Sequence, residues 1–251
     1  MIFLHPSIDP VIFSLGSIEI RWYGLAYVAA FLIGIQLMKR FNNKIQNNIK
    51  NKIIDDFFIW SIIGVIVGGR LGYVIFYQTL IFLNDPLYIF YIWQGGMSFH
   101  GGLMGIIIST YFFSKIKNIS FFYLSDLITL VAPIGLFFGR IANFINVELI
   151  GKVTTFPIAV IYPTIDNLPR HPSQLYEAFF EGFILFIILY FFFLKFYNKK
   201  MIGKLSGLFL LFYGLFRFLV EFIREPDANL GLFFNLFSMG QLLSLPLLLF
   251  G

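Results

Sequence analysis

The sequence contains no cysteine and few charged residues, and both absences narrow the kind of protein it encodes. Without cysteine there is no disulfide framework, no thiolate nucleophile and no cysteine-ligated metal site. Charged residues make up only 12% of the chain. Ordinary soluble domains contain roughly twice that share. The shortage of charge therefore excludes a soluble globular enzyme, a disordered chain and a coiled coil.

Hydrophobic residues are correspondingly abundant. They make up 59% of the 251 residues, and the mean hydropathy is +0.84. This composition is typical of a polytopic membrane protein. The last apolar run spans only ~21 Å as a helix, less than the ~30 Å of a hydrocarbon core, and contains Pro246. We expect an all-α membrane protein with about seven transmembrane helices, forming one integral membrane domain over residues 1–251. The apolar runs cover residues 22–38, 57–77, 97–114, 121–145, 174–194, 205–223 and 236–250.

Basic residues gather in alternate connections between these runs. Eleven of the 18 Lys and Arg residues lie in three such connections, at 39–52, 115–117 and 195–204. By the positive-inside rule, the N-terminus lies outside and the C-terminus inside. The net charge of +5 is thus explained by topology rather than by nucleic-acid binding. The proline-rich connection 146–173 is predicted to form a small, irregular external head, and the N-terminus lacks the pattern of a cleaved signal peptide.

Polar residues inside the apolar runs collect near their outer ends. A charged residue in hydrocarbon costs ~2.5–3.5 kcal/mol on insertion scales, so several of them require a reason. Asp126 is the exception, on the inner side. The sorting predicts a polar cavity in the outer half of the protein. The outer residues are Tyr23, Arg70, His100, Arg140, Asn143, Asn146, Glu177, Glu181, Arg217, Glu221 and Arg224.

Helical spacing places Tyr213, Arg217, Glu221 and Arg224 on one stripe about 80° wide. Arg217 and Glu221 form an i,i+4 pair. The stripe has two interpretations, which the residues alone leave open. One is a salt-bridged packing face between helices. The other is an anion site, because two arginines with one glutamate leave an excess of positive charge.

Arg140, Asn143 and Asn146 share a second polar face, also with two interpretations. Asparagines in membrane spans link helices by hydrogen bonds, and an arginine beside two amides also suits a phosphate. His100, among glycines at the same depth, is a candidate base near neutral pH. No metal-binding motif is present. The residues alone therefore predict an integral protein that handles an anionic lipid near the outer leaflet, with group transfer as a candidate activity.

Glycines recur every four residues in two of the apolar runs. Gly64, Gly68 and Gly72 form one set, and Gly135 and Gly139 form another. This spacing is typical of close helix packing. Paired glycines also flank His100, where we expect close backbone approach or an irregular helix start.

Six segments, in order along nearly the whole chain, carry a resemblance to a known family. The stretch Gly139–Gly151 closely resembles the signature of the prolipoprotein diacylglyceryl transferases, and the other five resemble further segments of the same family. These five are Arg21–Gly24, Gly68–Tyr73, Gly95–Gly102, Arg170–Glu177 and Arg217–Asp227.

The resemblance implies a specific reaction. The family transfers an sn-1,2-diacylglyceryl group from phosphatidylglycerol to the cysteine thiol in the lipobox of a preprolipoprotein signal peptide. A thioether forms and glycerol-1-phosphate leaves. No cofactor is needed, and the nucleophile belongs to the substrate. The resemblance also implies a seven-span bacterial inner-membrane protein, with its active site facing the outer leaflet.

Site residues follow from the matching motifs. Arg140 and Arg217 are implied to bind the phosphatidylglycerol headgroup and stabilise the leaving phosphate, with His100 and Tyr23 as the other catalytic candidates. The group that takes the thiol proton stays open. The implied substrate-binding residues are Asn143, Asn146, Glu148, Gly151, Glu221, Arg224 and Arg70.

Two departures from the family pattern affect stability more than chemistry. Val147 stands where many members have glycine, and valine disfavours positive φ, so a different loop geometry is expected. The chain also stops at Gly251, where relatives usually continue.

Two alternative functions remain. One is a transporter or flippase of an anionic lipid, although no clear repeat symmetry is found. The other is a different lipid enzyme, such as an acyltransferase or intramembrane protease, although the motifs of those enzymes are absent.

Overall fold

A computed structural model describes residues 2–16, 18–45, 49–91, 93, 95–226, 232–233 and 237–251. Its contacts divide the chain into two compact units. Unit 1 comprises residues 1–38 and 126–251, and unit 2 comprises residues 39–125. Each unit is described by itself below.

Helices form at all seven predicted apolar runs. They are α1 (Trp22–Lys44), α2 (Asn51–Tyr77), α4 (Phe99–Lys117), α5 (Phe121–Ile145), α6 (Ser173–Glu177) continued by a π-helical segment (Ala178–Ile184) and α7 (Leu185–Lys195), α8 (Lys204–Val220) and α9 (Met239–Phe250). Within the described residues, four helical stretches are long and apolar enough to cross a membrane: Trp22–Lys44, Asn51–Tyr77, Phe121–Ile145 and Ser173–Lys195. The chain is therefore a largely helical, multi-pass membrane protein.

In unit 2, α2 and α4 pack through facing glycines. An added Cβ on Gly68 would meet the carbonyl oxygen of Gly101 and lie 2.7 Å from Cα of Gly105. Gly64 and Gly72 are equally close to α4, so the predicted packing role is confirmed for this set. It is wrong for the second set, because a Cβ at neither Gly135 nor Gly139 would meet any described atom within 4 Å. Helix α3 (Thr79–Asn84) and a 3₁₀ turn (Pro86–Phe90) lie between α2 and α4 in the sequence.

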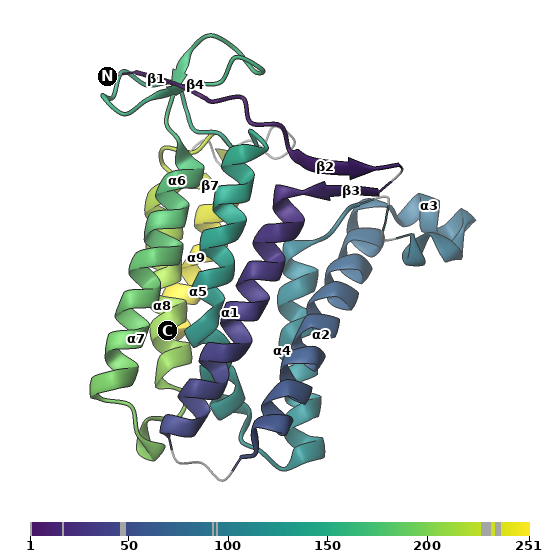
Figure 1. The fold of residues 1–251 in the computed structure, drawn as a ribbon, viewed down its shortest axis with the longest axis vertical. Helices are drawn as coiled ribbons and strands as arrows, with labels where there is room; N and C mark the ends of the chain where they lie inside the picture. Colours follow the sequence, from purple (N-terminus) through teal and green to yellow (C-terminus); the bar gives the residue numbers. More distant parts are fainter. Residues whose placement is uncertain are drawn as a thin grey trace. The chain divides into compact units, whose positions relative to one another are not determined.

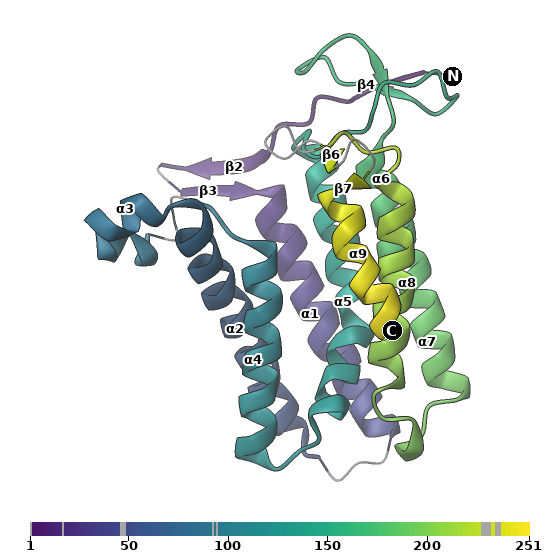
Figure 2. The same cartoon turned by 180° about the vertical axis from the view of Figure 1, so that it is seen from behind.

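The helices of unit 1 stand side by side in Figure 1 and, from behind, in Figure 2. Two glycines allow close contact between them. Gly182, in the π-helical segment, lies against Phe137 of α5, where an added Cβ would come within 2.6 Å of the Phe137 Cβ. Gly214 of α8 lies against Leu247 of α9 in the same way. Gly182 thus permits close packing of the helix at 173–195 on α5, and Gly214 permits close packing of α8 on α9.

Short strands, which the all-α expectation did not include, complete the described structure. Strand β1 (Phe3–Leu4) pairs in parallel with β4 (Val160–Ile161), which pairs antiparallel with β5 (Pro169–Arg170). The predicted irregular head at 146–173 thus supplies two strands of a three-stranded sheet, and the N-terminal strand β1 supplies the third. Two antiparallel pairs join β2 (Val11–Leu15) to β3 (Ile18–Arg21) and β6 (Leu232–Phe233) to β7 (Phe237–Ser238).

Asp126, the only polar span residue predicted on the inner side, has a structural role. Its buried carboxylate accepts hydrogen bonds from the Tyr197 hydroxyl at 2.7 Å and the Gly203 amide at 2.6 Å. It also accepts from the amide and hydroxyl of Ser206, at 2.8 and 2.7 Å. Asp126 therefore ties α5 to the start of α8 and to the connection before it.

Replacing this acceptor should destabilise unit 1. Asp126→Ala removes a buried charged acceptor from four donors, and each hydrogen bond to a charged group contributes roughly 1.5–3 kcal/mol. We expect a loss of at least about 3 kcal/mol, seen as a lower melting temperature in detergent. Asp56→Ala is the matched control, because that side chain is 41% exposed and 3.9 Å from Lys117. Equal melting temperatures for the two variants would contradict this role for Asp126.

Candidate active site

The helix at 173–195 supplies two carboxylates to a cluster of buried charges in unit 1. Glu177 ends α6 and Glu181 lies one turn later, in the π-helical segment. π-Helical turns are rare and are frequently found at functional sites. The contact of Gly182 with Phe137 brings this stretch against α5, which carries Arg140. Both glutamate side chains are fully buried.

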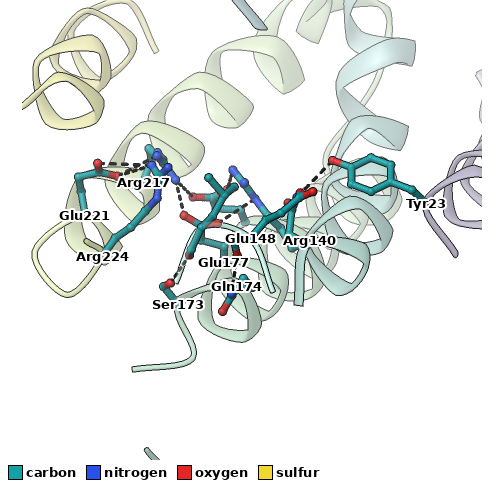
Figure 3. Close-up of polar contacts among 12 residues, drawn as sticks. Tyr23, Arg140, Glu148, Ser173, Gln174, Glu177, Arg217, Glu221 and Arg224 are labelled. Carbon is teal, nitrogen blue, oxygen red and sulfur yellow. Dashed lines mark hydrogen bonds and ion pairs between the residues drawn. The ribbon is translucent and has the colours of Figure 1, made fainter. Parts of the chain in front are cut away.

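Glu177 lies between two arginines that come from different helices (Figure 3). Its Oε2 is 3.0 Å from Nε of Arg140 on α5, and its Oε1 accepts a hydrogen bond from Arg217 on α8. Glu181 is more loosely held, with Oε2 at 3.4 Å from Nη2 of Arg140. The two guanidinium groups keep 16% and 13% of their side-chain surface exposed. The carboxylates are thus sealed inside while the arginines reach the surface.

Arg217 also pairs with Glu221, which confirms the predicted i,i+4 contact. Its Nη2 lies 2.8 Å from Oε2 of Glu221, and Nη1 of Arg224 lies 3.4 Å from the same oxygen. Gly240, at the start of α9, leaves room for this carboxylate, because a Cβ there would lie 2.6 Å from the Glu221 carboxyl carbon. The predicted stripe is therefore salt-bridged, but it is not one helix face. Helix α8 ends at Val220, and Arg224 lies beyond it, in an antiparallel bridge with Gly151. Glu177 extends the ion pairs to α5.

The expected excess of positive charge is wrong for this cluster. Sequence spacing grouped two arginines with one glutamate on a single stripe, but the structure adds Arg140 together with two glutamates from another helix. Three arginines then face three glutamates, so the formal charges balance. Balance is what burial demands, because an unpaired buried charge costs several kcal/mol. An anionic ligand must therefore compete with the glutamates for the arginines.

A second polar network joins Tyr23 to the signature segment. Nδ2 of Asn143 donates to the Tyr23 hydroxyl oxygen at 3.2 Å and to Oε2 of Glu148 at 2.7 Å. Nδ2 of Asn146 is 3.4 Å from Oε1 of the same glutamate. The residues of this predicted face therefore have different partners. Arg140 contacts the buried glutamates, and the amides of Asn143 and Asn146 contact Glu148.

The segment after α5 is held by the start of α6. The Gln174 side-chain amide donates to the carbonyl oxygen of Glu148, and the Ser173 hydroxyl donates to that of Leu149 at 2.6 Å. Gly151 follows, where its amide donates to the His171 carbonyl at 3.0 Å. A Cβ at Gly151 would collide with His171 and lie 2.9 Å from the carbonyl oxygen of Ile223. Gly151 therefore permits the close approach of this loop to the end of α8.

Val147 has a positive φ, although valine was expected to avoid this region of backbone conformation. Its φ is +55°, in the left-handed region that glycine adopts most easily, and Leu149 has the same value. The loop retains a left-handed conformation with a valine in it. For a β-branched residue this conformation is strained, because Cβ crowds the backbone.

Glycine at this position should stabilise the fold. A left-handed backbone conformation destabilises a non-glycine residue by roughly 1–2 kcal/mol. Glycine relieves this strain, but it loses more conformational entropy on folding, which offsets roughly 0.5–1 kcal/mol of the gain. We expect Val147→Gly to raise the free energy of unfolding by up to about 1 kcal/mol, measured by thermal unfolding in detergent. Val28→Gly, at a half-exposed helical position, should lower stability by roughly 0.3–0.5 kcal/mol, because glycine has a lower helix propensity than valine. A loss in both variants would show that Val147 is not strained.

Arg70 and His100 belong to unit 2, whereas the other nine predicted site residues belong to unit 1. Arg70 is buried and donates to the carbonyl oxygens of Tyr88 at 2.7 Å, Ile89 at 3.1 Å and Gly95 at 2.6 Å. It thereby holds the connection between α2 and α4. His100 is exposed in the first turn of α4, whose start is capped by Ser98. Roles for both in substrate binding or catalysis stay predictions. Asp227, the last residue of one resembling segment, lies outside the described residues.

Charged pairs also hold the head segment. Arg170 donates to Asp166 at 2.7 Å and to Glu225 at 3.2 Å. Its hydrogen bonds keep the pKa of Asp166 below the usual range. Desolvation lowers the pKa of His171, whose Nδ1 lies 3.3 Å from the Tyr176 hydroxyl. Arg170 also donates to the Gly151 carbonyl at 3.2 Å, so the head is fixed to the loop of the candidate site.

Sequence reasoning gave four residues of the site no catalytic or binding role: Glu177 and Glu181, which it placed only among the polar residues of the outer half, and Ser173 and Gln174. Two signals were present. Glu177 and Glu181 are charged residues in an apolar run, at i,i+4 spacing, and the first ends one of the resembling segments. Ser173 and Gln174 lie in that same segment. No spacing rule predicts that this helix meets Arg140 and Arg217, because that contact joins three elements far apart in the sequence.

Fold and site together define a helical membrane protein with a buried, charge-balanced arginine–glutamate cluster next to a polar loop. A family model described as prolipoprotein diacylglyceryl transferase matches residues 10–251. The chain is 50% identical over 246 residues to a phosphatidylglycerol–prolipoprotein diacylglyceryl transferase of Rickettsia bellii, covering 98% of this chain and 94% of the relative. A Vibrio parahaemolyticus enzyme of the same name is 48% identical over 98% of this chain and 89% of its own length. The chain belongs to the prolipoprotein diacylglyceryl transferase family.

Proposed function

We propose that this protein transfers the sn-1,2-diacylglyceryl group of phosphatidylglycerol to the lipobox cysteine thiol of a preprolipoprotein. A thioether forms and glycerol-1-phosphate leaves. The family supports the reaction, and its relatives are named for both substrates. The observation that carries the assignment to a site is the meeting of Arg140 and Arg217 at Glu177.

Two guanidinium groups at one point suit the charge that develops on the departing phosphate. The bond that breaks joins a carbon of the diacylglyceryl group to a phosphate oxygen. That oxygen stays with the departing glycerol-1-phosphate and gains negative charge as the bond breaks. Preorganised donors aimed at developing charge are among the strongest sources of catalysis. Arginine presents a planar fork that matches phosphate oxygens. Arg140 and Arg217 reach the surface and so are placed to exchange a glutamate for a phosphate.

The neighbouring polar network suits the rest of the headgroup. Tyr23, Asn143, Asn146 and Glu148 offer hydroxyl, amide and carboxylate groups beside Arg140. These groups match the free hydroxyls of a glycerol headgroup by hydrogen bonding. No cofactor takes part in this reaction, since the thiol, the lipid and the side chains supply every atom that moves.

The membrane placement follows the distribution of basic residues. Seven spans, with the N-terminus outside and the C-terminus inside, put the arginine cluster toward the outer leaflet of a bacterial inner membrane. Phosphatidylglycerol headgroups and the cysteine at the end of an exported signal sequence meet at that depth. The lipid bilayer is therefore both the solvent of the protein and the source of one substrate.

The direct test is transfer of radiolabelled diacylglyceryl from phosphatidylglycerol to a lipobox peptide by the purified protein. Label should reach the cysteine peptide and not its Cys→Ser counterpart. Arg140→Ala and Arg217→Ala should each lower the rate by about 100-fold or more, the loss typical of one lost charge-stabilising donor. Arg21→Ala, which removes an exposed arginine paired with Glu19, should leave the rate within about threefold.

Near-normal rates in the Arg140 and Arg217 variants, at wild-type protein levels, would remove these residues from the mechanism. A folded wild-type protein that moves lipid between leaflets without transferring label would instead support lipid transport.

A further inference from the structure

Glu181 is the least satisfied carboxylate of the buried cluster. Its side chain is fully buried, yet Oε1 accepts no hydrogen bond from any described group and lies 3.8 Å from Nη1 of Arg217. Glu177 also has one oxygen, Oε2, that accepts no hydrogen bond, but this oxygen lies 3.0 Å from the charged Nε of Arg140, and its other oxygen accepts from Arg217. A buried carboxylate oxygen without a donor is unfavourable, because the hydrogen bonds it made to water are not replaced. Such an oxygen is suited to receive a proton.

The other carboxylates near the site, those of Glu221 and Glu148, already have hydrogen-bond or ion-pair partners. Glu221 lies within 2.8 Å of Arg217 and also contacts Arg224. Glu148 accepts hydrogen bonds from the amides of Asn143 and Asn146. The ionisable groups that face Glu181 come from three elements: Arg140 on α5, Arg217 and Tyr213 on α8, and Glu177 on its own helix.

The reaction of the proposed function releases one proton and one new negative charge. The thiol loses its proton, and its sulfur forms a bond to the carbon of the diacylglyceryl group that carries the phosphate. The bond from that carbon to the phosphate oxygen breaks. The electron pair of the broken bond stays on the oxygen, so the phosphate changes from a monoanion to a dianion. Without a proton acceptor beside it, the charge-balanced cluster would have to hold the additional charge unpaired.

We infer that Glu181 accepts the proton of the substrate thiol, an assignment that rests on the proposed function. The S–H bond breaks as the carbon–sulfur bond forms, and the proton passes to the Glu181 carboxylate. The negative charge lost by Glu181 equals the charge gained by the phosphate. The total charge around Arg140 and Arg217 is therefore constant through the transfer step.

The geometry also couples the two halves of the step. Both guanidinium groups are partly exposed, and Glu181 lies fully buried beside them. As Arg140 and Arg217 turn from the glutamates to the lipid phosphate, they uncover Glu181 to the incoming thiol. Protonation of Glu181 then removes its competition for the arginines, which strengthens their hold on the leaving phosphate.

The test uses Glu181→Gln, which keeps the size of the side chain and removes its basicity, in the full-length protein. Loss of general-base catalysis should lower kcat with a cysteine peptide by about 100-fold or more, and KM for phosphatidylglycerol should change by less than about threefold. A peptide with selenocysteine in place of the lipobox cysteine carries a nucleophile already ionised at neutral pH. It should restore the rate of Glu181→Gln to within about tenfold of the wild-type rate with the same peptide, because no base is needed.

Glu177→Gln is the matched control. It removes the carboxylate that bridges both arginines, so KM for phosphatidylglycerol should rise and selenocysteine should not restore the rate. Melting temperatures near that of the wild type would show that both variants are folded.

The inference is overturned if Glu181→Gln keeps normal kcat with the cysteine peptide, or if selenocysteine leaves its rate low. It is also overturned if selenocysteine rescues His100→Gln and not Glu181→Gln. Wild-type protein that transfers nothing to either peptide would count against the proposed function itself, so the two failures are distinguishable.

Discussion

The bridge that Glu177 forms between Arg140 and Arg217 is the interaction on which the rest of the site depends. A fully buried carboxylate is tolerated only when it is paired, and each arginine in an apolar run needs a partner for the same reason. This requirement fixes the distance between α5, α8 and the helix at 173–195. Gly182 permits that distance on one side, and Gly240 makes room for Glu221 on the other.

A balanced cluster at a membrane surface is also suited to chemistry on a charged lipid. The glutamates hold both arginines in place without a bound ligand, and in the proposed reaction a lipid phosphate takes their place at the arginines while Glu181 is neutralised by a proton. The signature loop is fixed separately, through Glu148, Gly151 and the first residues of α6. Loop and cluster meet at α5, where Arg140 and Asn143 are three residues apart. Membership of a transferase family, together with this arrangement, favours group transfer over lipid transport.

The sequence predicted the helices because apolar runs must satisfy their backbone groups internally. It also predicted the Arg217–Glu221 pair and the α2–α4 glycine packing, since both follow from helical spacing. Contacts between segments far apart in the chain could not be predicted from the sequence. No period reveals that Glu177 reaches two other helices, so the charge of the cluster was misjudged. The short strands and the left-handed Val147 likewise depend on tertiary contacts that override local preference.

The claim that Arg140 and Arg217 act as one unit is tested most directly by a double-mutant cycle on the transfer reaction. Wild type, Arg140→Gln, Arg217→Gln and the double variant would be compared by kcat/KM for phosphatidylglycerol. Residues that share one carboxylate and one phosphate should be strongly non-additive, so the double variant should be at most about tenfold slower than the worse single variant. Fully additive losses would show that the two arginines act independently and would contradict the bridged site.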